Sequence, residues 1–309
     1  MRFQWKPKQE DRSTFQAVKL ERGFFGDDSD KVSPQTIIYD NRTYLNADDK
    51  ADQFLRGCYV DVETTGLDLD KDPVTQIAVA NFSYNKHTGE IVEIYESQMH
   101  FSDIDGDVPP HITDLTGITK DMIRGQRVPP EFFAPLLEAN IVIAHRAEFD
   151  RPRVERLMQS VGVQPKNQPW ACSKFDIDWK AHGLPSDGLE MLCLLHGFFY
   201  DAHDARNDVD AGVCLLSFVN AESGKTYLAE MLANARKKRS IITLAGRFEL
   251  RDTLKGMGYS FDFENKTNVK IVDDENIETE KAAAREAGAN LISVVAVDPR
   301  TRFRAPGKA

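Results

Sequence analysis

The ten residues from 58 to 67, Cys-Tyr-Val-Asp-Val-Glu-Thr-Thr-Gly-Leu, constrain the fold of this chain more than any other stretch. Side chains of a β-strand alternate between its two faces, so Asp61 and Glu63 share one face. Val60 and Val62 share the other face, which we expect to lie in a core. Two carboxylates on one face raise each other's pKa unless a cation lies between them. The pair predicts a divalent-cation site or, alternatively, an accidental acidic pair at an exposed strand end.

The three residues after this acidic pair, Thr64, Thr65 and Gly66, predict that the strand ends in a turn. Glycine lets a backbone come close to a ligand because it has no β-carbon. We therefore expect this turn to border whatever binds at the two acids.

The region from about 54 to 220 has the pattern of an α/β domain. Two of its strand-like runs are joined by a short turn around His87–Gly89, which indicates antiparallel pairing. Strands are expected at 58–63, 74–82, 91–95 and 141–144, and helices after Asp150, at 189–199 as a buried helix, and around Val209, Val213 and Leu216. This order predicts a mixed five-stranded sheet flanked by helices.

The flanking regions differ from this domain in composition. Residues 1–53 are polar and read as an N-terminal extension, with short strand-like pieces such as Thr36–Tyr39. Residues 221–240 read as a basic helix and linker. Residues 241–309 follow the order β-α-β-β-α-β, which fits a small α+β domain of ferredoxin-like type.

The bulk properties exclude several classes of protein. None of the apolar runs among the 309 residues approaches the length of a membrane span, and the N-terminal residues lack the apolar core of a secretion signal. The four cysteines form no C-x-x-C pair, which argues against a zinc site and predicts reduced core residues. A net charge of −10 argues against a protein that coats nucleic acid through bulk positive charge. We expect a cytoplasmic protein with no membrane association.

Two further acidic residues follow predicted strands or loops. Asp150 comes at the start of a helix after the run Ile141–Ala144, and Asp208 starts the last helix of the domain, five residues after His203. Each aspartate is either a metal ligand or a simple helix N-cap. The residues alone leave both alternatives open.

Three motifs in this order resemble those of the DnaQ-like 3′–5′ exonucleases, in which four acids and a histidine are combined (the DEDDh type). They are Asp-x-Glu-Thr-Thr-Gly at 61–66, Ala-His-x-Ala-x-Phe-Asp at 144–150, and His-x-Ala-x-x-Asp at 203–208. The segments Leu115–Thr119 and Trp170–Lys174 are also similar to the family. The second segment resembles the strand that follows the family's middle motif. The chain is nearest to the exonuclease X and DNA polymerase III epsilon type. The resemblance covers about 56 to 219 and implies an RNase H-like fold.

The resemblance also implies a role for each matching residue. Asp61, Glu63, Asp150 and Asp208 would hold two Mg²⁺ or Mn²⁺ ions, and His203 would be the general base. Such an arrangement suits phosphodiester hydrolysis, because two hard cations stabilise both the attacking and the leaving oxygen.

Substrate contacts follow from the same resemblance. Thr64, Thr65, Gly66 and Leu67 would meet the 3′-terminal nucleotide. Arg146 stands where the family usually has Asn, and would bind a phosphate or pair with Glu148. We interpret His145 as a core histidine and Asp210 as a solvated residue.

The C-terminal part contains two features that suggest contact with nucleic acid. Residues 225–255 carry eight Lys or Arg and three acids, which indicates a phosphate-binding patch or a solvated linker face. Tyr259, Phe261 and Phe263 alternate on a predicted strand, and would form a base-stacking platform or, alternatively, part of a core.

The sequence therefore predicts a metal-dependent 3′–5′ exonuclease that acts on nucleic acid with a free 3′ end, with single-stranded DNA as the expected substrate and DNA repair as the expected setting. The alternatives are a 3′–5′ exoribonuclease and a nucleic-acid-binding module on a degenerate nuclease fold. A homodimer is compatible with the sequence.

Overall fold

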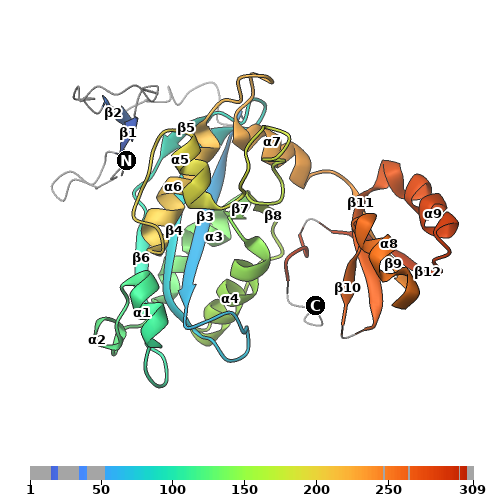
Figure 1. The fold of residues 1–309 in the computed structure, drawn as a ribbon. Helices are drawn as coiled ribbons and strands as arrows, with labels where there is room; N and C mark the ends of the chain where they lie inside the picture. Colours follow the sequence, from blue (N-terminus) through green and yellow to red (C-terminus); the bar gives the residue numbers. More distant parts are fainter. Residues whose placement is uncertain are drawn as a thin grey trace, which may run out of the picture. The chain divides into compact units, whose positions relative to one another are not determined.

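The structure is a computed structural model that describes residues 15–19, 35–39, 53–245, 248–263, 265–298 and 300–304. Its contacts divide the chain into two compact units, one made of residues 236–302 and one of the remainder (Figure 1). In the N-terminal part, β1 (Phe15–Lys19) and β2 (Gln35–Tyr39) pair antiparallel, and the rest of the predicted extension up to residue 52 lies outside the described residues. Within the described residues, no helix is long and apolar enough to cross a membrane.

The larger unit is built on a mixed six-stranded sheet in the order β5-β4-β3-β7-β8, with β6 paired to β4. β3 is antiparallel to β4 and parallel to β7, and β7 is parallel to β8. The strands are β3 (Phe54–Thr64), β4 (Val74–Asn85), β5 (Ile91–Ile94), β6 (Gln98–Phe101), β7 (Ile141–Ala144) and β8 (Trp170–Cys172). The predicted mixed sheet is confirmed, with one strand more than expected.

The additional strand is β6, which the sequence pattern does not indicate. β4 is 12 residues long, and β5 pairs with one part of it, at Phe82–Tyr84. β6 pairs with another part, at Gln76–Val79. The long strand therefore needs two short partners, and the four residues of β6 are too few to show an alternation in the sequence.

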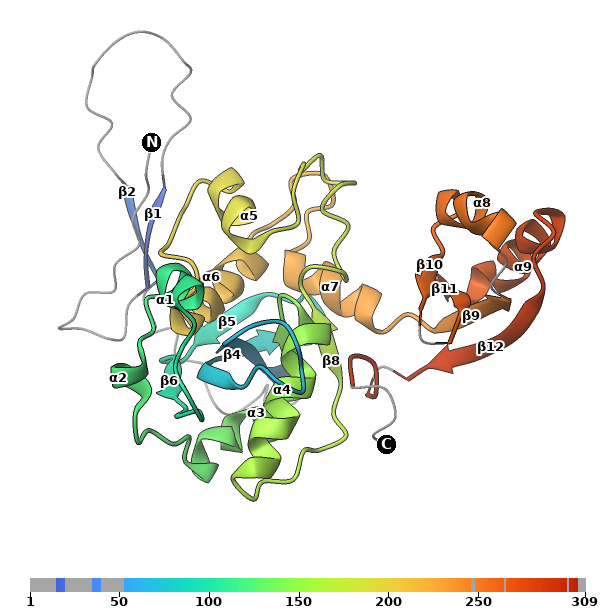
Figure 2. The ribbon, with the colours of Figure 1, turned by 60° about the horizontal axis from the view of Figure 1, so that its bottom comes forward.

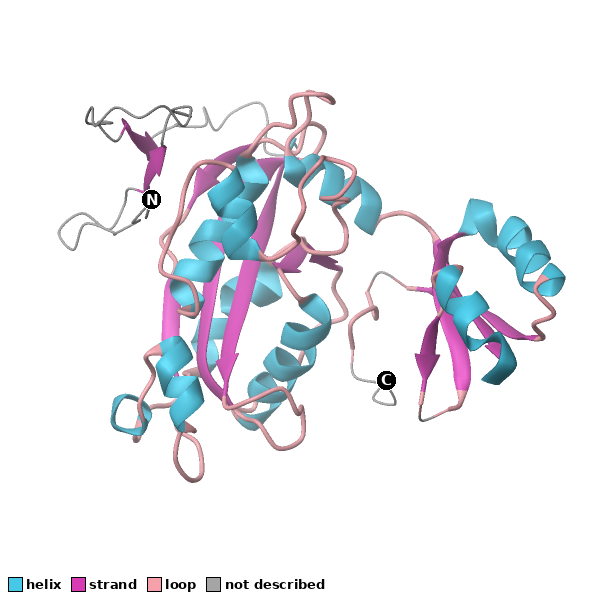
Figure 3. Ribbon diagram, in the orientation of Figure 1, coloured by secondary structure: helices cyan, strands magenta, loops and turns pink. Residues whose placement is uncertain are grey.

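Helices cover both faces of this sheet (Figures 2 and 3). In Figure 2, α5, α6 and α7 lie above the sheet, and α3 and α4 lie below it. The helical segments are α1 (Pro110–Thr116), α2 (Lys120–Ile123), η2 (Pro130–Phe133), α3 (Ala134–Glu138), α4 (Ala147–Ser160), α5 (Leu189–Leu195), α6 (Ala205–Ser217) and α7 (Tyr227–Ala235). The prediction of a fully buried helix at 189–199 is wrong, because Met191, Leu194 and Leu195 of α5 are exposed.

The side chains of β3 alternate between two hydrophobic cores, one on each face of the sheet. Cys58, Val60 and Val62 are buried in a cluster with residues of α4, as the sequence predicts. Tyr59 points the other way, into a cluster with residues of α6. Asp61 and Glu63 follow Tyr59 on the same face of the strand, so they lie on the α6 side of the sheet. All four cysteines are buried and none forms a disulfide, as expected.

Gly212 lets α6 approach β3 closely. A β-carbon at this position would lie only 2.3 Å from the ring of Tyr59. Asp208 lies one helical turn before Gly212 on α6. The close contact of glycine with tyrosine therefore sets how near Asp208 comes to the acids of β3.

Residues 236–302 form a small unit with its own antiparallel sheet, in the order β10-β11-β9-β12. β11 separates β9 from β10, and β9 separates β11 from β12, which is the split β-α-β arrangement of ferredoxin-like domains. Its elements are β9 (Arg239–Ala245), η3 (Phe248–Leu250), α8 (Arg251–Gly256), β10 (Ser260–Asp262), β11 (Thr267–Asp273), η4 (Asp274–Asn276), α9 (Ile277–Glu286) and β12 (Leu291–Val297).

Of the two alternatives for Tyr259, Phe261 and Phe263, the core is confirmed for Tyr259 alone, and a platform of all three is excluded. Tyr259 is buried in the core with Ile242 and Leu254. Phe263 lies beyond β10 and is exposed, with its ring edge-on to that of Phe261 at 5.1 Å. Only part of the set is therefore accessible, since the backbone leaves the strand before the third aromatic residue.

We predict that Gly212→Ala lowers the free energy of unfolding by about 1–3 kcal/mol, because the added methyl group overpacks the contact with Tyr59. Denaturant unfolding of the purified variant measures this. Gly256→Ala in α8, where a β-carbon meets nothing within 4 Å, is the matched control and should change stability little. Equal stability of the two variants would contradict the proposed close packing.

Candidate active site

Three carboxylates meet at one end of β3. Asp61, Glu63 and Asp208 each offer one oxygen, and these oxygens all lie within 4.8 Å of one another. The first two come from the same face of β3, and Asp208 comes from the first turn of α6, which packs on that face. The structure thus brings together residues that the sequence separates by about 145 positions.

Asp150 is the fourth acid and is only 2% exposed. It lies in the first turn of α4, whose N-cap is Arg146, so the N-cap interpretation of Asp150 is wrong. Its negative charge raises the pKa of both Asp61 and Glu63, which places it beside the cluster. The N-cap interpretation of Asp208 is wrong for the same reason, because Asp204 caps α6.

Burial raises the pKa of all four carboxyl groups. The pKa of Asp61 is held well above its usual value, first by desolvation and then by the charges of Asp208, Asp150 and Glu63. The pKa of Glu63 rises to about 8, and the pKa values of Asp150 and Asp208 rise to about 7, in each case mainly through burial. Without a cation, the site therefore retains protons at neutral pH.

The hydrogen bonds of Asp208 show how a cation would fit. The hydroxyl of Tyr200 donates to its Oδ1 at 2.8 Å. Its Oδ2 is buried and, within the described part of the chain, has no hydrogen-bond partner. Such an oxygen next to two further carboxylates is suited to a hard divalent cation such as Mg²⁺ or Mn²⁺, which prefers oxygen ligands.

Gln76 of β4 anchors the N-terminus of α6. Its Oε1 accepts a hydrogen bond from the backbone N–H of Ala205 at 3.0 Å, and its Nε2 donates to Asp204 at 3.2 Å. Gln76 also lies opposite Glu63 in the register of the sheet. One side chain thus ties β4, the strand paired with the one that carries two acids, to the helix that carries another.

His203 lies in the loop before α6 and is exposed, with a left-handed backbone (φ 66°) that a non-glycine residue rarely adopts. In the described residues its ring makes no hydrogen bond, so the structure leaves it accessible next to the N-terminus of the helix that carries Asp208. Strained backbone of this kind is often found at functional sites.

The turn after β3 is tightly ordered. The hydroxyl of Thr64 donates to the carbonyl of Gly66 at 2.6 Å, and that of Thr65 donates to Asp72 at 3.4 Å. A β-carbon on Gly66 would come within 2.5 Å of the Asp72 carboxylate, which explains the glycine. Leu67 is 77% exposed beyond this turn.

Arg146, His145 and Asp210 lie around the cluster. Arg146 is exposed, and its guanidinium lies 5.5 Å from the ring of Phe149 rather than in an ion pair with Glu148 among the described residues. His145 is a core histidine, as predicted, bonded to Ser173 and to the carbonyl of Asp187. The prediction that Asp210 is solvated is wrong, because it is buried and accepts a hydrogen bond from Ser97.

A family model described as "RNase_T: Exonuclease" matches residues 59–216, which is just over half of the chain and includes all four acids. The chain belongs to this exonuclease family. The predicted membership of an exonuclease family is thus confirmed.

Curated relatives are similar over this part only. The chain is 31% identical over 174 residues to the 3′-5′ exonuclease DinG of Staphylococcus haemolyticus, which is 52% of this chain and 17% of the relative. It is 30% identical over 110 residues to a DNA polymerase III PolC-type of Clostridium perfringens, which is 35% of this chain and 7% of the relative. The chain therefore spans a small fraction of the length of these relatives.

Among solved structures, the chain is similar to a zinc-bound complex of E. coli ExoI with ssDNA. The TM-score is 0.50 at 16% identity, and the match covers 76% of this chain and 68% of that one. This likeness supports the exonuclease fold.

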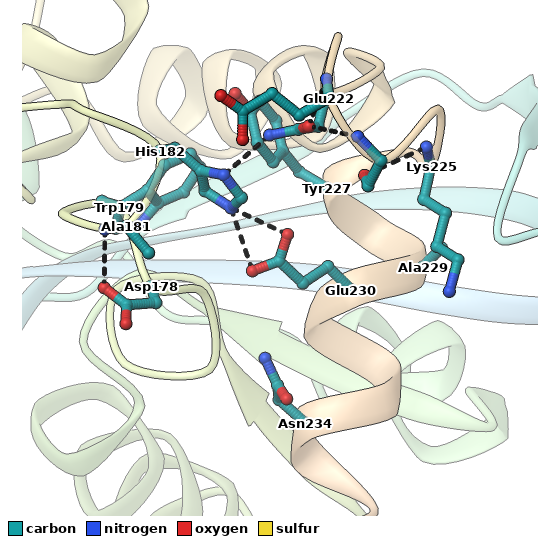
Figure 4. Close-up of polar contacts among 12 residues, drawn as sticks. Asp178, Trp179, Ala181, His182, Glu222, Lys225, Tyr227, Ala229, Glu230 and Asn234 are labelled. Atoms are coloured by element: carbon teal, nitrogen blue, oxygen red, sulfur yellow. Dashed lines mark hydrogen bonds and ion pairs between the residues drawn. The ribbon is translucent and has the colours of Figure 1, made fainter.

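Figure 4 shows a second polar cluster in the exonuclease domain, in which His182 points towards Glu230 of α7. His182 Nε2 donates to the carboxylate of Glu230 on α7, with its nearer oxygen at 2.8 Å, and the amide of Asn220 donates to His182 Nδ1 at 2.7 Å. His196 bonds the hydroxyl of Tyr227 at 3.0 Å. These histidines have protein partners and hold the loop around His182 to α7.

Sequence reasoning missed Gln76 and Tyr200 in this site. Gln76 has no distinct sign in the sequence, because β4 also contains other polar residues such as Thr75 and Ser83. Tyr200 has no such sign, because it lies outside all three exonuclease motifs. Both residues act on the positions of the acids and were found only through their hydrogen bonds.

We predict that the metal-free protein becomes less stable as the pH rises from about 5 to 8. The folded-state pKa values of Glu63, Asp150 and Asp208 lie near 7 to 8, above the unfolded values of about 4. The folded protein therefore binds more protons than the unfolded chain in this range, and its free energy of unfolding falls as they are lost.

Denaturant unfolding at each pH, with EDTA and then with Mn²⁺, measures this dependence. Mn²⁺ should reverse the loss of stability at high pH. Asp208→Asn should make the free energy of unfolding depend less steeply on pH, because one of the charges is removed. A metal-free stability that rises between pH 5 and 8 would contradict the electrostatic account.

We also predict that Tyr200→Phe weakens Mn²⁺ binding by about 10-fold to 100-fold, since partners of metal ligands commonly contribute that much. The variant leaves Oδ1 of Asp208 without its donor. Calorimetric titration with Mn²⁺ measures the affinity. Tyr95→Phe removes a hydroxyl bonded to Ser83 and Glu93, away from the acids, and is the control. Equal affinities in both variants would exclude a role for Tyr200.

Proposed function

We propose that the protein is a metal-dependent 3′–5′ exonuclease that removes nucleotides from the 3′ end of single-stranded DNA as nucleoside 5′-monophosphates. The observation that carries the proposal is the oxygen cluster of Asp61, Glu63 and Asp208. It lies beside the buried Asp150, in a chain whose family is that of exonucleases.

The four acids would hold two divalent cations, Mg²⁺ or Mn²⁺. When bound, such cations stabilise the negative charge that develops on the phosphate in the transition state. The fit is supported by the unpartnered Oδ2 of Asp208 and by the raised pKa values of the acids, since a cation allows all of them to ionise together.

The proton transfer would be carried out by a side chain of the protein. His203 would take the proton of the attacking water, a role suited to an exposed imidazole. The water oxygen bonds to phosphorus as the bond to the 3′ oxygen of the preceding nucleotide breaks. The shortened strand leaves with a 3′ hydroxyl, and the released nucleotide keeps the phosphate on its 5′ carbon.

The turn Thr64–Leu67 would contact the terminal nucleotide, and Arg146 would bind a phosphate. Support for the turn comes from its position directly after Glu63 and from the exposed side chain of Leu67. The exposure of Arg146 next to α4 supports the second role.

DNA is preferred over RNA because the similar solved structure contains ssDNA and a curated relative is a DNA polymerase III PolC-type. A 3′–5′ exoribonuclease is the second candidate. A non-catalytic binding module is disfavoured by the presence of all four acids and His203.

We predict that Asp208→Asn lowers kcat by at least about 10²-fold, in the range seen when charge stabilisation of a transition state is lost. The assay uses 5′-labelled ssDNA, duplex DNA and ssRNA of one sequence with Mg²⁺, and mass spectrometry identifies the released nucleotides. Asp210→Asn, a buried acid two residues further along α6, is the matched control and should keep most of the activity.

Degradation of ssRNA in preference to ssDNA would favour the second candidate. No nucleotide release by the wild-type protein with Mg²⁺ or Mn²⁺ would overturn the proposal, and so would full activity of the Asp208→Asn variant.

A further inference from the structure

The connection from β3 to β4 is a short loop that carries the exposed Leu67. Within the loop, the backbone N–H of Thr65 donates to the carbonyl of Pro73 at 3.1 Å, which closes its base. The carboxylate of Asp72 accepts a hydrogen bond from the backbone N–H of Asp68 at 2.8 Å. These bonds shape the loop itself, but they do not fix where its tip lies relative to the four acids.

Arg153 of α4 links the tip of this loop to the helix that carries Asp150. Its Nη2 donates to the carbonyl of Leu67 at 2.7 Å, and its Nη1 donates to the carbonyl of Phe149 at 2.9 Å. The guanidinium lies 3.6 Å from the centre of the Phe149 ring. Arg153 is 5% exposed, and its hydrogen bond to the Leu67 carbonyl is partly buried.

The burial of Arg153 has a cost that helix packing alone does not explain. Its Nε is buried and has no hydrogen-bond partner in the described part of the chain. An apolar side chain would cover the same surface without leaving a buried N–H unpaired. The feature that only arginine offers at this place is a charged donor that reaches the Leu67 carbonyl while stacking on an aromatic ring.

Helix α4 connects this contact to the metal site. Asp150 lies three residues before Arg153, on the same side of the helix. Arg156, one turn later, donates to the carbonyl of Leu69 and, at 2.7 Å, to Asp70. One rigid helix thus holds a metal-binding acid at its first turn and the tip of the loop along the following turns.

We propose that Arg153 is a positioning residue for the 3′-terminal nucleotide. It fixes the Leu67 backbone at a set distance from the acids, so that the exposed Leu67 side chain meets the terminal base while the adjacent phosphate reaches Asp61, Glu63 and Asp208. This inference rests on the proposed exonuclease function and adds a residue that lies outside all three exonuclease motifs. The ligand is the terminal nucleotide of a DNA strand, bound from its base side by the loop.

Arg153→Met tests the proposal, because methionine keeps much of the aliphatic volume beside Phe149 but donates no hydrogen bond. We expect KM for a 5′-labelled ssDNA to rise about 10-fold while kcat changes by less than about threefold, the pattern of lost substrate binding rather than lost chemistry. Arg153→Lys should recover part of the affinity. Arg56→Met, at the other end of β3 in an exposed ion pair with Glu138, is the control and should change neither parameter.

A second measurement monitors the local stability of the loop and needs no nuclease reaction. Amide hydrogen exchange at residues 65–72 should be at least about tenfold faster in Arg153→Met than in the wild type, with α6 unchanged, because local opening becomes easier. Combining Arg153→Met with Leu67→Ala should raise KM little more than Leu67→Ala alone, since both act on one contact.

An unchanged KM in Arg153→Met, together with unchanged exchange of the loop, would overturn the proposal. A fall in kcat that parallels a loss of global stability would also overturn it, because that pattern indicates a purely structural arginine. If the wild-type protein releases no nucleotide, the proposed exonuclease function fails, and the exchange experiment still decides whether Arg153 holds the loop.

Discussion

Repulsion among four closely spaced carboxylates, one buried and three half-buried, is the constraint on which the rest of this exonuclease domain depends. Burial and mutual charge raise the pKa values of Asp61, Glu63, Asp150 and Asp208 far enough that they cannot all ionise alone near neutral pH. Divalent cations would resolve this conflict, and the same cations would provide the charge that phosphodiester hydrolysis needs. In the proposed function, the instability of the metal-free cluster and its catalytic use therefore have one physical cause.

The fold holds these charges together with contacts made elsewhere. Gly212 lets α6 pack closely on Tyr59, and Gln76 ties the start of α6 to β4. Arg153 connects α4 to the loop beyond the strand that carries two of the acids. Each contact joins an element with an acid to a neighbouring element, so the positions of the carboxylates are determined by packing rather than by attraction between them.

Much of the site could be predicted from the sequence, because period-two alternation places Asp61 and Glu63 on one face and the three motifs recur in register. The supporting residues could not, since Tyr200 and Gln76 act through contacts with residues far along the chain. The prediction that Asp210 is solvated failed for a similar reason. A charged residue two positions after Asp208 looks solvated in the sequence, but the helix turns it towards Ser97 and buries it.

The central claim is that the cluster of Asp61, Glu63 and Asp208 binds divalent cations, and the most direct test is a crystal structure of the protein grown with Mn²⁺. Anomalous scattering at the manganese edge locates the metal independently of any assay. The account predicts an anomalous peak coordinated by oxygens of these three residues, with Asp150 contributing to the same centre. A fully ordered cluster without an anomalous peak, at Mn²⁺ concentrations that support nuclease activity, would contradict it.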